Sequence, residues 1–188
     1  VDFLGFPAVD VNRPRSSGLN GLFKDIFDRA FALTALILLA PLFLVLAACI
    51  KYSSPGPIFF KQPRLGLNGK KFNVFKFRSM KVHQEFGTVK QATQNDPRIT
   101  RIGQFIRRTS LDELPQLWSI LVGDMSFVGP RPALFNQSEL IELRTLHGVD
   151  KILPGLTGWA QVNGRDELSI AIKVQFDEVY LHKQSFWF

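Results

Sequence analysis

Two adjacent carboxylates stand in the segment of the chain that offers the most chemistry. Asp112 and Glu113 follow the basic pair Arg107 and Arg108, and Ser110 precedes Glu113 with S-x-x-E spacing. An ionised Asp or Glu can attack an electrophile or bind a metal ion. The same spacing fits a capping box, in which Ser110 and Glu113 only start a helix. Both interpretations place the carboxylates at a helix N-terminus, where the macrodipole and the two arginines favour the ionised form.

Other catalytic signatures are absent from the sequence. It has no D-x-D metal motif, no Walker loop, and no spacing of His83, His147 and His182 that fits a metal site or a triad. The histidines are therefore expected in surface or core roles. Cys49 is the single cysteine, which excludes an internal disulfide and a cysteine-rich metal site and is typical of a reducing compartment.

The elements that would position the carboxylates begin with an apolar run. Residues 30–50 contain no charged side chain, and a straight helix of this length would measure about 31 Å, enough to span a hydrocarbon core. Pro41 in the middle of the run kinks a helix and leaves halves of about 15 Å. Basic residues flank both ends, Lys24 and Arg29 before and Lys51 after, whereas a span usually has them on one side. The sequence favours a re-entrant hairpin in one leaflet over a single span.

The end of the same run resembles a lipoprotein processing site, with the sequence LAAC at residues 46–49. On that interpretation the run would be a signal peptide and Cys49 an acylated N-terminus. The run is long for a signal peptide, begins only at residue 30, and has no charged region at the start of the chain before it. A membrane hairpin is the better interpretation.

Turn signals divide the remainder of the chain. Residues 1–20 have Pro, Ser and Gly without a clear period, which predicts a linker or the remnant of an upstream domain. Residues 58–62 and 71–78 have β-like composition, and the Asn-Gly pair at 68–69 between them is a hairpin signal. Helical spacing is found in three later segments, at 101–108, 117–122 and 140–146.

These elements predict an α+β fold. It combines a mostly helical domain and its short β-hairpin with a Pro-kinked re-entrant membrane helix. The predicted divisions are the linker at 1–20, the membrane hairpin at 21–52 and the remaining domain at 53–188.

The composition indicates anionic partners and a membrane. A net charge of +7 and a pI near 9.8 favour nucleic acid, anionic lipid head groups or phosphorylated small molecules, and charge alone does not choose among them. Eighteen Phe against two Tyr provide more apolar surface than a small soluble core needs, which a membrane would absorb.

Six motifs follow one another along the chain: GPIFFKQ at 56–62, KFRSM at 76–80, DPRITR at 96–101, SLDELPQL at 110–117, GDMSFVGPRP at 123–132 and PGLTGWAQVNGR at 154–165. In this order they resemble the bacterial sugar transferase family, the monotopic polyprenyl-phosphate phosphoglycosyl transferases. The resemblance covers about residues 22–188, and the combination is far more specific than any one motif.

The resemblance implies transfer of a hexose-1-phosphate from a UDP-sugar to undecaprenyl phosphate, with release of UMP and a covalent aspartyl sugar-phosphate intermediate. This would be the first membrane step of exopolysaccharide, capsule or O-antigen synthesis. It also implies the bacterial inner membrane, with the catalytic domain on the cytoplasmic face. By motif, Asp112 would be the nucleophile and Glu113 the ligand of Mg²⁺ or Mn²⁺. The expected partners are both substrates and membrane lipid but no nucleic acid, and a homodimer is left open.

Both implied substrates are anionic, so their charge must be offset before a carboxylate can attack phosphorus, and Arg, Lys or a divalent cation can do this. The candidate phosphate- or substrate-binding cations are Lys76, Arg78, Arg107 and Arg131, each of which could instead be a solvated surface residue. Asp177 is a further site candidate, with an ordinary helix-face acid as the alternative.

The kink departs from the family pattern. Many members have Ser-Pro there, whereas this chain has Ala40-Pro41, so other side chains or the helix partner must satisfy the freed backbone groups. Residues 2–7 look like the join to an upstream domain in larger members, and residues 185–188 stop where the family usually continues. The sequence is therefore expected to be a piece of a longer protein.

Two other functions fit part of the sequence. A non-catalytic membrane-anchored module that binds anionic lipid or a partner through its basic face would not need Asp112 or Glu113. A nucleic-acid binder is suggested by charge only, has no recognisable binding motif, and leaves the apolar run without a purpose. No residue indicates which sugar is transferred.

Overall fold

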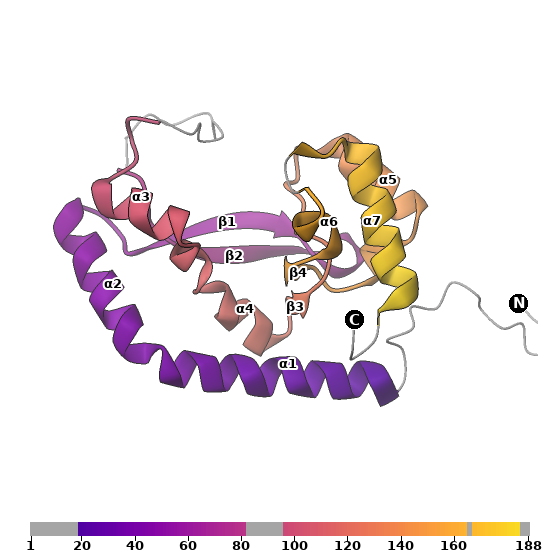
Figure 1. The fold of residues 1–188 in the computed structure, drawn as a ribbon, viewed down its shortest axis with the longest axis horizontal. Coiled ribbons are helices and arrows are strands. Elements are labelled where there is room, and N and C mark those ends of the chain that lie inside the picture. The colour runs from indigo at the N-terminus through magenta and orange to yellow at the C-terminus, as the bar shows by residue number, and fades with distance from the viewer. Residues whose placement is uncertain (1–18, 82–95, 165–166, 185–188) are drawn as a thin grey trace, which may run out of the picture.

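The computed structural model describes residues 19–81, 96–164 and 167–184. Residues 1–18 of the expected linker, His83 and residues 185–188 lie outside this described part. Helices dominate the ribbon in Figure 1, and two short two-stranded sheets lie between them, so the predicted α+β class is confirmed.

The apolar run folds as two helices that meet at a sharp bend. The first, α1, covers Leu19–Leu38 and the second, α2, covers Ala40–Ser53, and they are bent by 61° to form an L along one side of the molecule (Figure 1). The break lies just before Pro41, which occupies the first turn of α2, because proline has no N–H to donate to the carbonyl of Ile37. Side-chain capping does not replace the lost bonds at the start of α2.

Within the described ranges, only the bent pair has the length and composition for a membrane element. Among the described residues, no single helix is both long enough and apolar enough to cross a bilayer, whereas α1 and α2 together pass that test. The bend is consistent with the predicted re-entrant hairpin.

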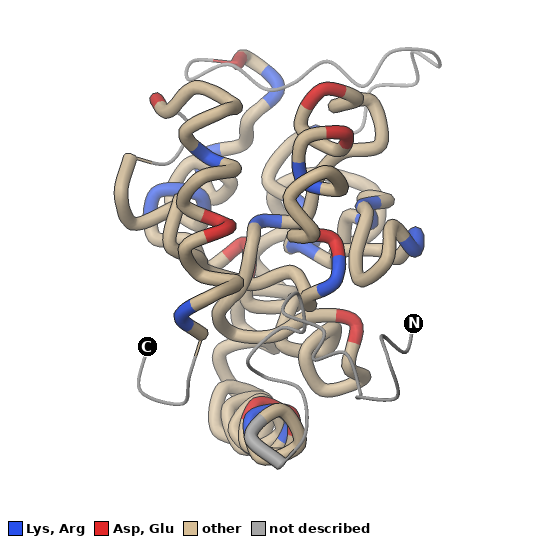
Figure 2. Tube along the Cα trace, turned by 90° about the vertical axis from the view of Figure 1, so that its right-hand side faces the viewer, with Lys and Arg blue, Asp and Glu red and all other residues tan. Residues whose placement is uncertain are grey.

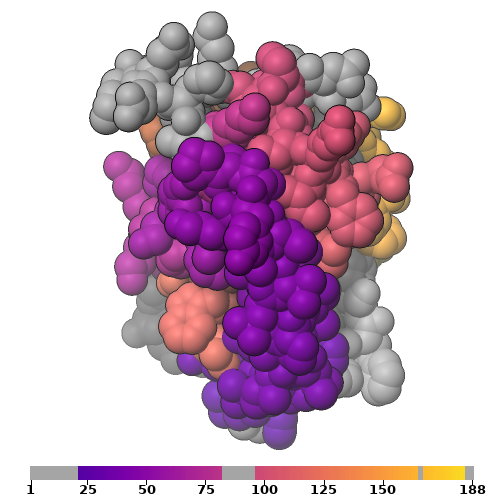
Figure 3. Space-filling model, turned by 90° about the vertical axis from the view of Figure 1, so that its left-hand side faces the viewer, coloured from indigo at the N-terminus to yellow at the C-terminus, as the bar shows by residue number. Residues whose placement is uncertain are grey.

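Both arms of the L pack on the rest of the protein. Ala32 of α1 is fully buried beside Leu117 and Ile120 of α4 (Gln116–Val122). Leu46 and Ile50 of α2 pack with Phe77 and with Ile106 of α3 (Arg101–Arg108). Large apolar side chains remain exposed on the other side of the two helices, among them Phe23, Ile37, Leu38, Leu44 and Val45. Figure 3 shows α2 and the end of α1 as a continuous ridge on that face.

The charged part of α1 is hydrogen-bonded to the start of a strand of the second sheet. All charged residues of this helix lie between Lys24 and Arg29, and Figure 2 shows the helix end-on. Asp28 is buried and accepts hydrogen bonds from Lys24 at 2.7 Å and from the Ser126 hydroxyl at 2.6 Å. Ser126 begins β3 (Ser126–Val128), so this network joins α1 to the second sheet.

The predicted hairpin is confirmed as β1 (Phe59–Leu65) and β2 (Lys71–Phe77), which pair antiparallel. Asn68 and Gly69 in the connecting 3₁₀ turn η1 (Leu67–Gly69) have φ values of 53° and 69°, the left-handed conformation for which an Asn-Gly turn is suited. Cross-strand partners share a face of the sheet, and Phe60 pairs with Lys76. Alternation along β1 then places Arg64 on the face that carries Lys76.

The helix predicted at 101–108 is confirmed as α3. Thr100 caps it by accepting a hydrogen bond from the backbone N–H of Gly103 at 2.9 Å. Gly103 is required because a Cβ there would lie 1.9 Å from the carbonyl oxygen of Ser79, which follows β2. This contact sets α3 against the end of the hairpin.

The C-terminal part contains a second sheet that the sequence analysis did not predict. It consists of β3 and β4 (Gly155–Thr157), which pair parallel and come from distant parts of the chain. The helices around it are α5 (Ser138–Leu146), the 3₁₀ turn η3 (Val149–Lys151), α6 (Trp159–Val162) and α7 (Ile170–Lys183). The loop after β3 carries Arg131.

Candidate active site

Asp112 and Glu113 lie in a short 3₁₀ turn, η2 (Leu111–Glu113), between α3 and α4. Ser110 precedes the turn in the left-handed conformation at φ 57°, which is uncommon for a residue other than glycine and changes the chain direction after α3. The capping box left open by the sequence does not form, because the Ser110 side chain caps nothing. The carboxylates are therefore available for another role.

The turn is attached to the bent helix pair. Leu111 and Leu114, on either side of the two carboxylates, pack against the cluster that contains Leu46 and Ile50 of α2. The helices before and after the turn are those that contact α2 and α1. The carboxylates therefore lie close to the apolar hairpin.

Glu113 is held by two cations. Its Oε1 lies 2.7 Å from Lys76 Nζ and 3.3 Å from Arg131 Nη2, and the Glu113 side chain is only 16% exposed. Burial favours the neutral form, but Lys76 and Arg131 outweigh it and hold the pKa of Glu113 below its ordinary value. Glu113 is therefore ionised and fixed in position at neutral pH.

Asp112 has a different electrostatic setting. Burial raises the pKa of Asp112 above the ordinary value. The positive charges of Lys76 and, less strongly, Arg107 lower this pKa, and the negative charge of Glu113 raises it. The sequence analysis expected the helix dipole, Arg107 and Arg108 to favour ionisation. In the structure Lys76 exerts the strongest opposing effect, Arg107 a weaker one, and burial outweighs both.

A further cation, Arg64 of β1, lies beside this group and was missed in the sequence. Its Nη1 donates to the carbonyl of Pro132 at 3.0 Å and its Nη2 to Gln62 Oε1 at 2.9 Å. Burial and the charge of Arg131 lower its pKa to about 10, and Glu113 opposes the shift, so it stays charged at neutral pH. The hairpin register would have revealed it, since alternation places Arg64 on the face of Lys76.

Two of the residues predicted to bind substrate lie elsewhere. Arg78 is buried, with its guanidinium donating to the carbonyls of Ile50, Ser54 and Pro55 at the end of α2. Asp177 of α7 is 1% exposed and is ion-paired with Arg144 at 2.7 Å. Burial raises the pKa of Asp177 and Arg144 opposes the rise. Arg78 serves the fold at the end of α2, and Asp177 does not reach the two carboxylates.

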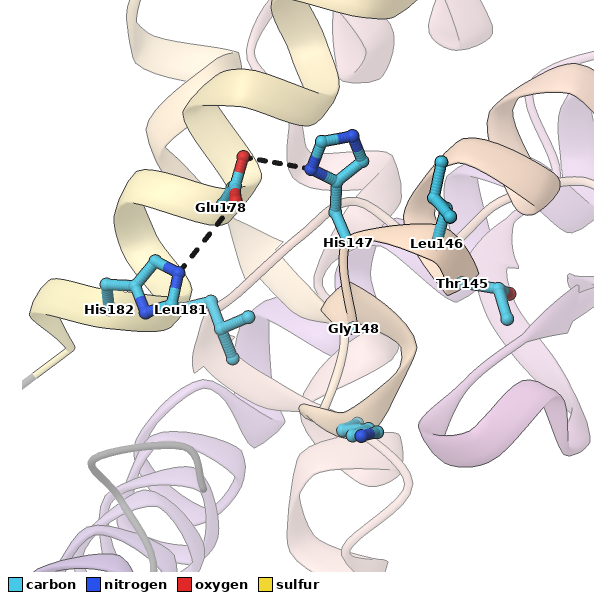
Figure 4. Close-up of a pocket in the computed structure, with 8 residues that line it drawn as sticks. Thr145, Leu146, His147, Gly148, Glu178, Leu181 and His182 are labelled. Atoms are coloured by element: carbon cyan, nitrogen blue, oxygen red, sulfur yellow. Dashed lines mark hydrogen bonds and ion pairs between the residues drawn. The ribbon is translucent and has the colours of Figure 1, made fainter. Parts of the chain in front are cut away.

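His147 and His182, the histidines in the described part of the chain, form no metal centre. His147 and His182 both approach Glu178, at 3.0 Å and 3.9 Å, on an open pocket between the end of α5 and α7 (Figure 4). Throughout the described ranges, no three His, Cys, Asp or Glu side chains are arranged to hold a metal ion. Of the surface and core roles left open by the sequence, these two histidines have the surface role.

The carboxylate pair fits Mg²⁺ only together with a phosphorylated ligand. Magnesium is usually held by one or two carboxylates, waters and substrate phosphates rather than by a cage of protein ligands. Asp112 and Glu113 provide two carboxylates, and Lys76, Arg64 and Arg131 provide positive charge for a diphosphate beside them. The residues present can therefore bind a divalent cation complexed with a nucleotide diphosphate.

Known proteins resemble this chain over most of its length. The chain is 47% identical over 98% of its length to the UDP-glucose:undecaprenyl-phosphate glucose-1-phosphate transferase of Escherichia coli (strain K12), and 48% identical over 87% to the protein of that name in Xanthomonas campestris. It spans only 41% and 36% of those two relatives. It is also 40% identical over 89% of its length to the exopolysaccharide production protein ExoY of Rhizobium meliloti, of which it covers 80%.

The family follows from these matches. The model of the bacterial sugar transferase family matches residues 19–188, which includes every described element. The protein is a member of the bacterial sugar transferase family.

Proposed function

We propose that this chain transfers a hexose-1-phosphate from a UDP-sugar to undecaprenyl phosphate and releases UMP. The observation that carries the proposal is the pair of adjacent carboxylates, which cations surround on one side and the apolar hairpin supports on the other. A site of this kind can bind an anionic donor while it faces a lipid acceptor. The names of the relatives point to UDP-glucose as the donor.

Asp112 is the proposed nucleophile. Its Oδ forms a bond to the β-phosphorus of the donor, and the bond from that phosphorus to the bridging oxygen breaks, so UMP leaves with the electron pair. In the second step a phosphate oxygen of undecaprenyl phosphate attacks the same phosphorus and expels the Asp112 carboxylate. The products are UMP and an undecaprenyl diphosphate-linked sugar.

The cations stabilise the charge that these steps concentrate. Lys76 and Arg131 already contact Glu113, and Arg64 lies against the same group, so each can donate to phosphate oxygens without a large rearrangement. Glu113, which stays ionised, would hold Mg²⁺ or Mn²⁺ together with Asp112. When bound, the metal ion would polarise the diphosphate and offset its charge.

The hairpin is proposed to lie in one leaflet of the bacterial inner membrane, with the remainder of the chain on the cytoplasmic face. The exposed apolar side chains of α1 and α2 support this placement, and so does the sharp bend between the helices. Because the residues that flank Asp112 and Glu113 pack on α2, a lipid phosphate at the membrane surface could reach the site.

A panel of donors tests this function. Detergent-purified protein would be incubated with undecaprenyl phosphate and with UDP-glucose, UDP-galactose or their N-acetyl relatives, and UMP release would be measured. UDP-glucose should react fastest, Asp112→Asn should be inactive, and Glu178→Gln, which changes a half-buried carboxylate outside the site, should behave like wild type. Absence of UMP release with every donor, or full activity of Asp112→Asn, would overturn the proposal.

A further inference from the structure

A buried ion pair connects α7 and α5 to the loop that carries Arg131. Asp177 Oδ2 accepts hydrogen bonds from Arg144 Nε at 3.0 Å and Arg144 Nη2 at 2.7 Å. The Asp177 side chain is 2% exposed and the Arg144 side chain 11%. The remaining terminal nitrogen, Arg144 Nη1, donates to the backbone carbonyl of Arg131 at 2.7 Å. The guanidinium of Arg144 thus joins a buried carboxylate to the backbone of a residue in the candidate active site.

The loop around Arg131 is held from two sides. Arg144 binds the carbonyl of Arg131, and Arg64 binds the next carbonyl, that of Pro132. Pro130 and Pro132 on either side of Arg131 restrict φ, so few alternative backbone conformations are open to the loop. The Arg131 side chain extends from this fixed backbone to Glu113 at 3.3 Å.

Stability alone is a weak explanation for the ion pair. Two charges lose hydration when they are buried, and well-packed apolar residues in their place are often as stable or more so. A buried pair that also donates to the backbone of an active-site residue has a use that an apolar pair could not replace.

We infer that Asp177 and Arg144 are positioning residues that hold Arg131 in the place where it contacts Glu113 and the donor diphosphate. The inference rests on the proposed function for its consequence in catalysis. Asp177 fixes the rotamer of Arg144, Arg144 fixes the backbone at Arg131, and Arg131 contributes its charge to the site. Neither Asp177 nor Arg144 touches substrate.

The neighbouring residue on α7 provides a matched control. Glu178 also connects α7 to the end of α5, through His147 at 3.0 Å, but this exposed contact does not lead to Arg131 (Figure 4). Glu178→Gln removes a carboxylate at the next position and a contact between the same two elements. It should leave kcat/KM for the UDP-sugar unchanged.

A double-mutant cycle tests the inference. Asp177→Asn should lower kcat/KM for the UDP-sugar by about tenfold to a hundredfold, as misplacement of an active-site group does. In the Arg131→Ala background the same substitution should change kcat/KM by less than about twofold, because its effect acts through Arg131. Equal losses in both backgrounds would show a merely structural role and overturn the inference.

A second variant covers the case in which Asp177→Asn does not fold. Asp177→Leu combined with Arg144→Met replaces the ion pair by apolar residues and removes the donor to Arg131. It should remain folded by circular dichroism and show the same low activity. Wild-type kcat/KM in this variant would overturn the inference.

A measurement without substrate separates the inference from the proposed function. In ¹⁵N-arginine-labelled protein, the Nε–H resonance of Arg131 should be that of an ordered side chain in wild type and Glu178→Gln. In Asp177→Asn the Arg131 side chain should move among several conformations, and its Nε–H resonance should show the averaged shift of a mobile side chain. An unchanged resonance in that variant would contradict the positioning role. If wild type released no UMP from any donor but showed this pattern, the proposed function would fail while the positioning role stood.

Discussion

Replacing Arg78 with methionine should loosen the attachment of α2 to the rest of the protein. The guanidinium donates to Ser54 O at 2.6 Å, Pro55 O at 2.8 Å and Ile50 O at 3.3 Å. Ile50 O keeps a partner in the variant, since the Ser53 hydroxyl also donates to it at 2.9 Å. Pro55 is exposed, so water can replace the second bond. Only Ser54 O would be left buried without a donor.

The loss of stability follows from the single carbonyl left without a donor. An unsatisfied buried carbonyl costs about 1–3 kcal/mol. The loss of the hydrogen bonds to Ile50 O and Pro55 O is partly offset, because methionine does not bury a charge. The free energy of unfolding should therefore fall by about 2 kcal/mol. For a chain of this size that corresponds to a Tm lower by roughly 4–8 °C.

Thermal unfolding of detergent-purified protein, followed by circular dichroism, measures this change. Arg108→Met is the control, because Arg108 is exposed and its side chain makes no hydrogen bond or ion pair within the described part of the chain. Its Tm should equal that of wild type. An unchanged Tm for Arg78→Met, or an equal drop in the control, would show that the contacts at the end of α2 do not stabilise the fold.

Further predictions concern pH, metal and membrane. UMP release should decline as pH falls through the pKa of Asp112, which burial raises above the ordinary 3.8, because a protonated carboxyl cannot attack phosphorus; a rate independent of pH between neutrality and that point would contradict this. EDTA should abolish UMP release and Mg²⁺ restore it, and Glu113→Gln should need more Mg²⁺ for half-maximal rate; unchanged metal dependence would exclude Glu113 as a ligand. Cysteines placed at the exposed Leu22 and Tyr52 should react with an impermeant reagent from the same side of the membrane, and Pro41→Leu should move Tyr52 to the opposite side; labelling from opposite sides in the parent protein would refute the hairpin.

Local sequence patterns predicted the β1–β2 hairpin, α3 and the break in the apolar run. An Asn-Gly pair needs the left-handed conformation and so marks the β1–β2 turn, and the helical spacing at 101–108 marks α3. A proline within an apolar run marks a break. The break itself falls at Leu39, because Pro41 has no N–H and cannot donate the hydrogen bond that would continue the helix from the preceding turn. Each of these features depends on residues within a few positions of one another.

The site depended on contacts that local patterns do not encode. Arg64 and Arg144 are ordinary basic residues in the sequence, and only the fold brings them to Arg131. Arg78 lies in a family motif, yet its guanidinium donates to backbone carbonyls at the end of α2. The electrostatics of Asp112 also depended on burial, which the charges of the neighbouring arginines in sequence could not reveal.

The measurement that tests the central claim most directly is covalent labelling of Asp112 in the absence of lipid acceptor. Protein mixed with UDP-sugar labelled at the β-phosphate should release UMP in a single burst and retain the label, which undecaprenyl phosphate should then remove. Asp112→Asn should lose both burst and label but stay folded, since the raised pKa of Asp112 means that its ionised form does not stabilise the fold. A ternary-complex rate law without a burst, or an Asp112→Asn protein that still takes up the label, would contradict the account.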